Sequence, residues 1–305
     1  HPAALGTPHR NYGIRRGGDL MLGSVIGDVI GSRFETQTMI DQPVSLLAPE
    51  CGFTDDSVCV AAVADSLVHG RPLHACFQDW VLRYPTAEYG AKFKAWAVAA
   101  EGPAYGSIGN GGAMRVSPAA ILGADLCEVV SLATRATSVS HNHPDAVGAA
   151  VLLAETIHIA LRGASPADVR QHIASRGARL QPVSAYRDLA HFTTDASATI
   201  GQALSAATSA TSFEEAMRHC IAVGGDTDTI CCMAGGLAEA LFGLPNDLVD
   251  RALPFLPEDV VHVLGALYSK AGRGTLGLRT QGSPKPAVSW KQRRSLFKRF
   301  HFPFP

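Results

Sequence analysis

The sequence predicts an all-α fold in a single large domain. Apolar residues recur mostly at helical spacing, and the alternation of β-branched residues that is typical of strands is scarce. With 47% apolar and 17% charged residues, the 305-residue chain has ample material for a buried core and does not resemble a disordered protein. We expect one helical domain over residues 19–270, between a flexible segment at 1–18 and a flexible tail at 271–305.

The first predicted helix covers residues 19–34. It carries three glycines spaced four residues apart, beginning at Gly23, which would let another backbone approach one side closely. Asp28 lies inside this apolar helix, and Glu35 follows seven residues later, two turns along the same face.

Further helices are marked by start and stop signals. A proline at the first helical position begins the helix at 144–161. Residues 165–168 and 212–215 match the capping-box pattern. The helices predicted after the first cover 57–70, 73–83, 124–134, 144–161, the segment after Ser165, 212–223, 230–243 and 258–269.

Charge is distributed unevenly although the net charge is −1. Residues 19–270 contain 15 basic and 27 acidic residues, a net charge of −12, whereas both terminal segments are purely basic. An acidic body disfavours long nucleic acids as partners, which need Lys and Arg against phosphates. The tail motif WKQRRSLFKR (290–299) supplies basic residues with aromatics that could contact nucleic acid, but a solvated, disordered end is the favoured interpretation.

Seven cysteines are scattered without a C-x-x-C pair, which favours reduced, buried thiols over disulfides or zinc. The first ten residues lack the apolar core of a signal peptide, and no apolar run reaches 18 residues. We therefore predict a cytoplasmic protein that does not span a membrane.

Two segments place Thr and paired Asp at the start of a small-residue helix, at 54–56 and 226–229. Each alone is explained by helix capping, since Thr and Asp accept hydrogen bonds from free N–H groups. If packed helices brought both together, four carboxylates would repel strongly unless cations lay between them. Oxygen ligands without His or Cys favour Mg²⁺ or Mn²⁺. The pair therefore predicts a two-metal site.

Two loops are further candidates for ligand contacts. The loop GSIGNGGAMR (106–115) could bring backbone N–H groups close to a phosphate, but it lacks P-loop spacing, and a tight structural turn fits it equally well. His141, in SHNHP (140–144), either contacts a phosphate or ribose or has a capping or packing role. His158 lies within an apolar helix and is predicted as a core residue.

Five segments occur in the order of a known family: GSVIGDVIGSRFE (23–35), FTDDSV (53–58), GNGGAMRVSP (109–118), SHNHPDA (140–146) and VGGDTDTICCMAGGLAEALFG (223–243). Together they resemble the ADP-ribosylglycohydrolase family, also called ADP-ribosyl-acceptor hydrolases, over most of the chain. The TDD and GGDTDT segments are the most specific of these.

The resemblance implies an orthogonal helical bundle with two Mg²⁺ or Mn²⁺ ions in a central cleft. The implied metal ligands are Thr54, Asp55, Asp56, Asp226, Asp228 and Thr229. Glu35, Asp55 and Asp56 are the implied catalytic residues. The implied substrate-binding residues are Ser107, Gly109, Asn110, Gly111, Gly112, Met114 and His141. Some relatives stack aromatic residues near the loop on adenine; here Ile108 precedes Gly109, and Tyr105 is the candidate.

The implied reaction removes ADP-ribose from a serine or arginine side chain of a modified protein by cleaving the bond at C1 of the terminal ribose. GGDTDTICCMAGG, with Glu35, looks most like the serine-type branch. One alternative is a non-catalytic ADP-ribose-binding or crystallin-like relative. Another is a hydrolase of a different ADP-ribose conjugate or of ADP-ribosylated nucleic acid. A site formed within one chain predicts a monomer.

Overall fold

The computed structural model describes residues 22–36, 44–99, 102–188 and 192–272. Over these residues it contains helices and no strand, which confirms the all-α prediction. An isolated bridge joins Gly109 to Asp195. The predicted flexible segment at 1–18 and all but the first two residues of the predicted basic tail lie outside the described residues.

Helices α1 (Gly23–Gly31) and α12 (Thr227–Phe242) lie directly against each other. A Cβ atom at Gly27 would lie 2.1 Å from the carbonyl oxygen of Cys231, so only glycine permits this approach. The close backbone contact expected from the glycine spacing is confirmed. Because the two helices run antiparallel, the end of α1 lies beside the start of α12.

Helix α12 forms the centre of the bundle. Apart from Asp228 and Glu239, its residues are small or apolar on every side, and all of them from Thr227 to Ala240 are buried. A helix that is apolar all round is stable only inside a protein. Besides α1, the helices that pack on it are α7 (Pro144–Ala160), α10 (Ala196–Thr208) and α11 (Phe213–Val223).

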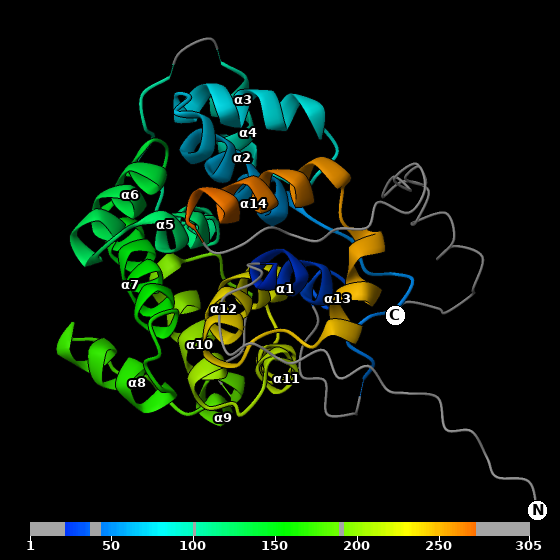
Figure 1. The fold of residues 1–305 in the computed structure, drawn as a ribbon, viewed down its shortest axis with the longest axis vertical. Helices are drawn as coiled ribbons and strands as arrows, with labels where there is room; N and C mark the ends of the chain where they lie inside the picture. The colour runs from blue at the N-terminus through cyan, green and yellow to red at the C-terminus, as the bar shows by residue number, and fades with distance from the viewer. Residues whose placement is uncertain (1–21, 37–43, 100–101, 189–191, 273–305) are drawn as a thin grey trace, which may run out of the picture.

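A second group of helices packs around α2 (Asp55–His69), whose first turn carries the predicted Asp pair. Figure 1 shows α2 beside α3 (Leu73–Arg83) and α14 (Glu258–Lys270), with α4 (Ala91–Val98) close to α3. Since α1 contacts both α2 and α12, it joins the two groups and brings the starts of α2 and α12 to one region.

The remaining described helices complete the bundle around these two groups. They are α5 (Ser117–Leu122), α6 (Leu126–Ser138), α8 (Pro166–Ser175), α9 (Val183–Asp188), α13 (Asn246–Ala252) and the 3₁₀ turns η1 (Asn110–Gly112) and η2 (Leu253–Phe255). No described helix is long and apolar enough to cross a membrane.

The structure corrects several local predictions. Helix α1 ends at Gly31, so Glu35 lies in the turn that follows and not on the same helical face as Asp28. The capping box at Ser165 is complete, but Ser212 forms only half of one, because the Glu215 carboxylate accepts from Thr211 instead.

Helix α2 begins two residues earlier than predicted, so Asp55 and Asp56 lie inside its first turn. Helices α4, α5, α9, α10 and α13 were not predicted. Six of the seven thiols are buried as expected, whereas Cys127 is exposed.

Candidate active site

The start of α2 is held in place by a buried carboxylate of α1. Asp28 accepts hydrogen bonds from the backbone N–H and the hydroxyl of Thr54, at 2.9 and 2.7 Å, and from the N–H and hydroxyl of Ser57. Thr54 also caps α2 by accepting from the N–H of Asp56. The capping explanation is therefore correct for Thr54. Burial raises the pKa of Asp28 to about 6, and the four hydrogen bonds act against that rise.

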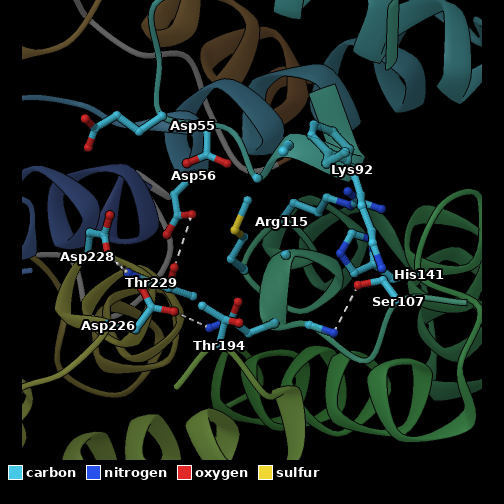
Figure 2. Close-up of a pocket in the computed structure, with 18 of the residues that line it drawn as sticks. Asp55, Asp56, Lys92, Ser107, Arg115, His141, Thr194, Asp226, Asp228 and Thr229 are labelled. Carbon is cyan, nitrogen blue, oxygen red and sulfur yellow. Dashed lines mark hydrogen bonds between the residues drawn. The ribbon is translucent and has the colours of Figure 1, made fainter. Parts of the chain in front are cut away.

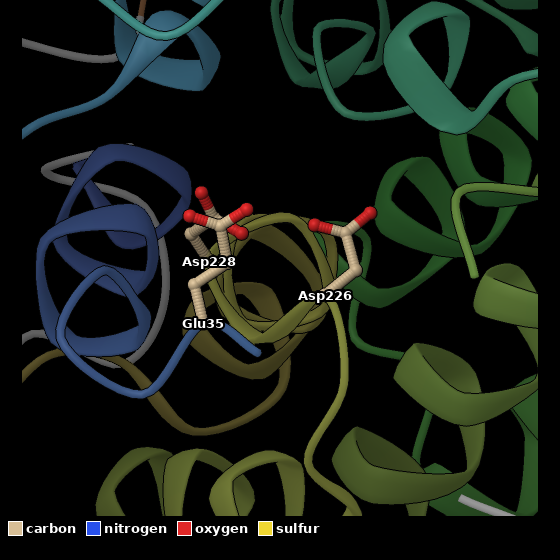
Figure 3. A group of neighbouring side chains, drawn as sticks. All are labelled: Glu35, Asp226 and Asp228. Atoms are coloured by element: carbon tan, nitrogen blue, oxygen red, sulfur yellow. The ribbon is translucent and has the colours of Figure 1, made fainter. Parts of the chain in front are cut away.

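The second acidic cluster meets the turn after α1. One carboxylate oxygen each from Glu35, Asp226 and Asp228 lies within 4.8 Å of the others (Figure 3). The turn is tied to the start of α12 because the N–H of Thr36 donates to the carbonyl oxygen of Gly225 at 2.9 Å. Thr36 has a φ of 65°, a left-handed conformation that is rare for a β-branched residue.

The two clusters face one cavity of about 470 Å³. Asp55 and Asp56 lie across it from Asp226 and Asp228 (Figure 2). The hydroxyl of Thr229 spans the gap to the Asp56 carboxylate at 3.4 Å. The juxtaposition expected of the two Thr-Asp segments is thus present in the fold.

The carboxylates of this cavity have raised pKa values. Burial, followed by the charge of Asp226, raises the pKa of Glu35 to about 7. The pKa values of Asp55, Asp56 and Asp228 lie well above the usual range, mainly because of burial and then because of neighbouring carboxylates. Among the described residues, no Lys or Arg forms an ion pair with any of them. Such a concentration of charge calls for cations.

The donor set fits a divalent metal. Oδ2 of Asp56 is buried and has no hydrogen-bond partner among the described residues, as expected for an atom that faces an ion. The neighbouring donors are carboxylate and hydroxyl oxygens, which suit Mg²⁺ or Mn²⁺.

The glycine-rich loop is fixed to both sides of the cavity. Nδ2 of Asn110 donates to Oδ2 of Asp226 at 2.6 Å, which links the loop to the acidic cluster. The N–H of Gly109 donates to the hydroxyl of Ser107, and that of Asn110 to the carbonyl oxygen of Thr194. Since these two N–H groups are already engaged, the loop does not present a complete ring of free donors to a phosphate.

His141 lies at the end of the cavity away from the Asp residues, together with Ser107 and Arg115 (Figure 2). It does not cap α7, because the capping residue is His143. Burial, and then the charge of Arg115, lowers the pKa of His141 to about 3, so the imidazole is neutral at physiological pH. Its ring packs edge-on against Tyr105, at 5.5 Å between centroids.

Most of the residues predicted for the site do line the cavity. They are Glu35, Asp55, Asp56, Ser107, Gly109, Asn110, Gly111, Met114, His141, Asp226, Asp228 and Thr229, with Tyr105. Thr54 and Gly112 do not line it. The Thr54 hydroxyl donates to Asp28, and a Cβ at Gly112 would meet Thr137 at 2.5 Å, so Gly112 serves packing. His158 is buried and bonded to a backbone carbonyl, as predicted for a core residue.

Several cavity residues carry no motif and were missed. Glu88 and Lys92 are exposed side chains from the α3–α4 region, and Phe192 is an aromatic ring with 48% exposure. Arg115 was quoted within the loop but given no role. A charged residue beside a glycine-rich loop is only a weak signal of a functional role. No local sequence pattern indicates that Glu88, Lys92 or Phe192 lines a site.

Comparison with known proteins identifies the family of this chain. The profile described as "ADP-ribosylglycohydrolase" matches residues 14–273, most of the chain. The chain belongs to the ADP-ribosylglycohydrolase family. The family description and the names of its relatives indicate an ADP-ribosyl glycohydrolase, a hydrolase of glycosidic bonds.

Individual relatives share modest identity with this ADP-ribosylglycohydrolase. ADP-ribosylhydrolase ARH3 of Homo sapiens is 24% identical, with 73% of this chain and 84% of that protein covered. ADP-ribosylarginine hydrolase Tri1 of Pseudomonas putida is 27% identical, with 76% and 72% covered. A solved structure titled "ADP-ribosylglycohydrolase-related protein complex" is 27% identical, with a TM-score of 0.64 over 82% of this chain and 96% of that one.

Proposed function

We propose that this enzyme removes ADP-ribose from modified serine or arginine side chains by hydrolysing the bond at C1 of the terminal ribose, with two Mg²⁺ or Mn²⁺ ions. The observation that carries the proposal is that the starts of α2 and α12 meet Glu35 in one cavity. One similar protein is named an ADP-ribosylhydrolase and another an ADP-ribosylarginine hydrolase, which supports an ADP-ribose conjugate as substrate and leaves the acceptor side chain open.

Six side chains would hold the metals: Thr54, Asp55, Asp56, Asp226, Asp228 and Thr229. When bound, two divalent ions would polarise ribose oxygens and align a water for attack at an oxocarbenium-like centre. Thr54 differs from the others because it does not line the cavity and its hydroxyl proton is engaged with Asp28, so only an oxygen lone pair is left to act as a ligand.

We infer that Glu35 moves a proton at the reacting atoms. It lies beside Asp226 and Asp228, and burial together with the charge of Asp226 raises its pKa to about 7. This pKa belongs to the metal-free protein, and bound cations would favour the ionised carboxylate, so the proposed role rests on the position of Glu35 beside the acidic cluster. We assign it the general acid or base role.

The end of the cavity that is lined by the glycine-rich loop (106–115) would bind the parts of ADP-ribose beyond the terminal ribose. Ser107 and His141 offer polar groups at hydrogen-bonding positions, and the exposed face of Phe192 offers a stacking surface for adenine. The amide of Asn110 also donates to Asp226, so we propose that it orients that carboxylate in addition to contacting the substrate.

The test is release of ADP-ribose from ADP-ribosylated serine and arginine peptides, with and without Mg²⁺ or Mn²⁺. We expect metal-dependent release from at least one peptide, and loss of release by at least about a thousandfold in Asp55→Ala and Asp226→Ala. Asp247→Ala, which removes an exposed carboxylate outside the cavity lining, is the matched control and should act like wild type.

Two results would contradict the proposal. Release by Asp226→Ala at the wild-type rate would remove the acidic cluster from the chemistry. If wild type and both variants bound ADP-ribose equally and none released it from any peptide, the chain would be a binding module.

A further inference from the structure

Arg115 is a fully buried cation without a carboxylate partner. Its guanidinium has 0% exposure, and among the described residues no Asp or Glu pairs with it. It lies 4.5 Å over the ring of Phe77 and donates to the carbonyl oxygens of Ala136 and Thr137. Burying a charge is costly, and these hydrogen bonds and the ring contact offset part of that cost in place of a counter-ion.

The hydroxyl of Ser140 connects this cation to His141. Nη2 of Arg115 donates to Oγ of Ser140 at 2.7 Å, and that Oγ lies 2.8 Å from Nδ1 of His141. Ser140 has 0% exposure. These three side chains form a short chain that runs from the core to the cavity (Figure 2 shows its two ends, Arg115 and His141).

The direction of each proton in this chain follows from the donors present. Arg115 can only donate, so Ser140 Oγ accepts from it. The buried hydroxyl must then place its own proton on an acceptor, and Nδ1 of His141 is the one acceptor within reach among the described residues. Nδ1 therefore accepts, and the ring proton of the neutral imidazole is on Nε2.

Nε2 lies on the open side of the ring. A Cβ atom at Gly111 would lie only 3.1 Å from it and one at Gly109 would lie 3.8 Å away, so the absence of side chains in the loop keeps this edge accessible. Among the described residues no protein group accepts from Nε2. The nearby positive charge of Arg115 also opposes a second proton on the ring.

We propose that Arg115, acting through Ser140, is a positioning residue that holds His141 as a neutral imidazole whose Nε2–H donates into the cavity to an oxygen of the ligand. The identity of that ligand as ADP-ribose rests on the proposed function. The charge of Arg115, which forms no ion pair among the described residues, also favours an anionic group of the ligand at this end of the cavity.

The tautomer is measured directly on the ligand-free protein by ¹⁵N–¹H correlation spectra of the histidine rings, assigned with His141→Gln. We expect a protonated Nε2 and an unprotonated Nδ1 for His141 at pH 7.5. In Ser140→Ala the preference should weaken, so that the two nitrogen shifts move toward each other.

Binding of ADP-ribose, measured by calorimetry, then tests the consequence. Ser140→Ala should weaken binding about fivefold, the size of one hydrogen bond, and should raise KM for a modified peptide more than it lowers kcat. The matched control is Ser205→Ala, which removes an equally buried hydroxyl that donates to the carbonyl oxygen of Gln181 and should leave binding unchanged.

Arg115→Lys keeps the charge but loses the forked donors, and it should weaken the tautomer preference as Ser140→Ala does. If Arg115→Lys does not fold, the histidine ring spectra and the ADP-ribose binding of Ser140→Ala still test the proposal. A proton on Nδ1 in wild type, or unchanged ring shifts and unchanged ADP-ribose binding in Ser140→Ala, would overturn the proposal. If wild type binds no ADP-ribose, the proposed function fails, while the ligand-free spectra still test the Arg115–Ser140–His141 chain.

Discussion

Asp28 accepts hydrogen bonds from both the backbone N–H and the hydroxyl of Thr54. This pair joins the middle of α1 to the start of α2, and it fixes the direction in which Asp55 and Asp56 enter the cavity. The carboxylate lies behind the proposed metal ligands, with 0% exposure, and acts on the site by orienting them.

Replacing Asp28 with Asn should weaken metal binding without removing a proposed ligand. The amide leaves at least one of the four donors without an acceptor, so the first turn of α2 loses its alignment. We expect Mn²⁺ affinity, measured by electron paramagnetic resonance titration, to fall about 10- to 100-fold. Asp65→Asn, a buried carboxylate of α2 paired with Arg71, is the control. Equal Mn²⁺ affinity in the two variants would refute a positioning role for Asp28.

The glycine face of α1 should not tolerate a methyl group at its centre. Gly27→Ala would place Cβ 2.1 Å from a backbone oxygen of α12, which forces the helices apart. We expect the free energy of unfolding to fall by about 2 kcal/mol or more. Gly148→Ala, in α7 with open space around it, should be neutral or stabilising by up to about 1 kcal/mol. Chemical denaturation of both variants provides the comparison, and similar losses would argue against a close contact.

Metal stabilisation should depend on pH in a defined direction. Glu35 has a pKa raised from 4.5 to about 7, so the metal-free folded state holds a proton between those values that the unfolded state has lost. The stability of the metal-free protein therefore falls as pH rises through this window, and a divalent ion must displace that proton. We expect Mn²⁺ to raise Tm more at pH 8 than at pH 5.5. A larger shift at pH 5.5 would mean that the ion binds elsewhere.

The stability that depends on the protonation of His141 should change with pH in the opposite direction to that of Glu35. Its folded pKa is lowered from 6.5 to about 3, so the unfolded state takes up a proton first as pH falls. The free energy of unfolding that comes from a neutral His141 is fully present above pH 6.5. It is lost on acidification, by about 2 kcal/mol between pH 6.5 and 5. Comparing wild type with His141→Gln isolates this effect from the carboxylates. A difference in unfolding free energy that does not change with pH would show that His141 titrates normally.

Phe192 should contribute to adenine binding. Its ring is partly exposed at the cavity, and loss of base stacking costs about 1–3 kcal/mol. Phe192→Ala should weaken ADP-ribose binding about tenfold and leave binding of ribose 5-phosphate, which lacks the base, unchanged. Ile108→Ala, an exposed apolar residue outside the cavity lining, is the control. Equal loss for both ligands would argue that Phe192 shapes the cavity and does not stack on adenine.

Much of the fold could be predicted because its helices carry local signals. Each of these signals lies within a dozen residues: the apolar period of α2, the proline that begins α7 and the glycines of α1. Helix α10 was missed because its sequence, ASATIGQALSAAT, is dominated by small residues and lacks a clear apolar face, so its stability comes from burial against α7 and α12. Glu35 was misplaced because the end of α1 depends on a turn tied to Gly225, far along the chain.

The sequence by itself determined the helical class, the close approach of another backbone to the glycine side of α1 and the chemistry of the donors, because periodicity, glycine spacing and residue type are local properties. Only the tertiary structure decided that Thr54 turns its hydroxyl toward Asp28, that Asn110 binds Asp226, and that Arg115 is buried beside Ser140 and His141. The physical reason is that hydrogen-bond partners and desolvation arise from segments that meet only after packing. The type of a residue limits the groups that it can bind, and the residues packed around it determine which of those groups it contacts.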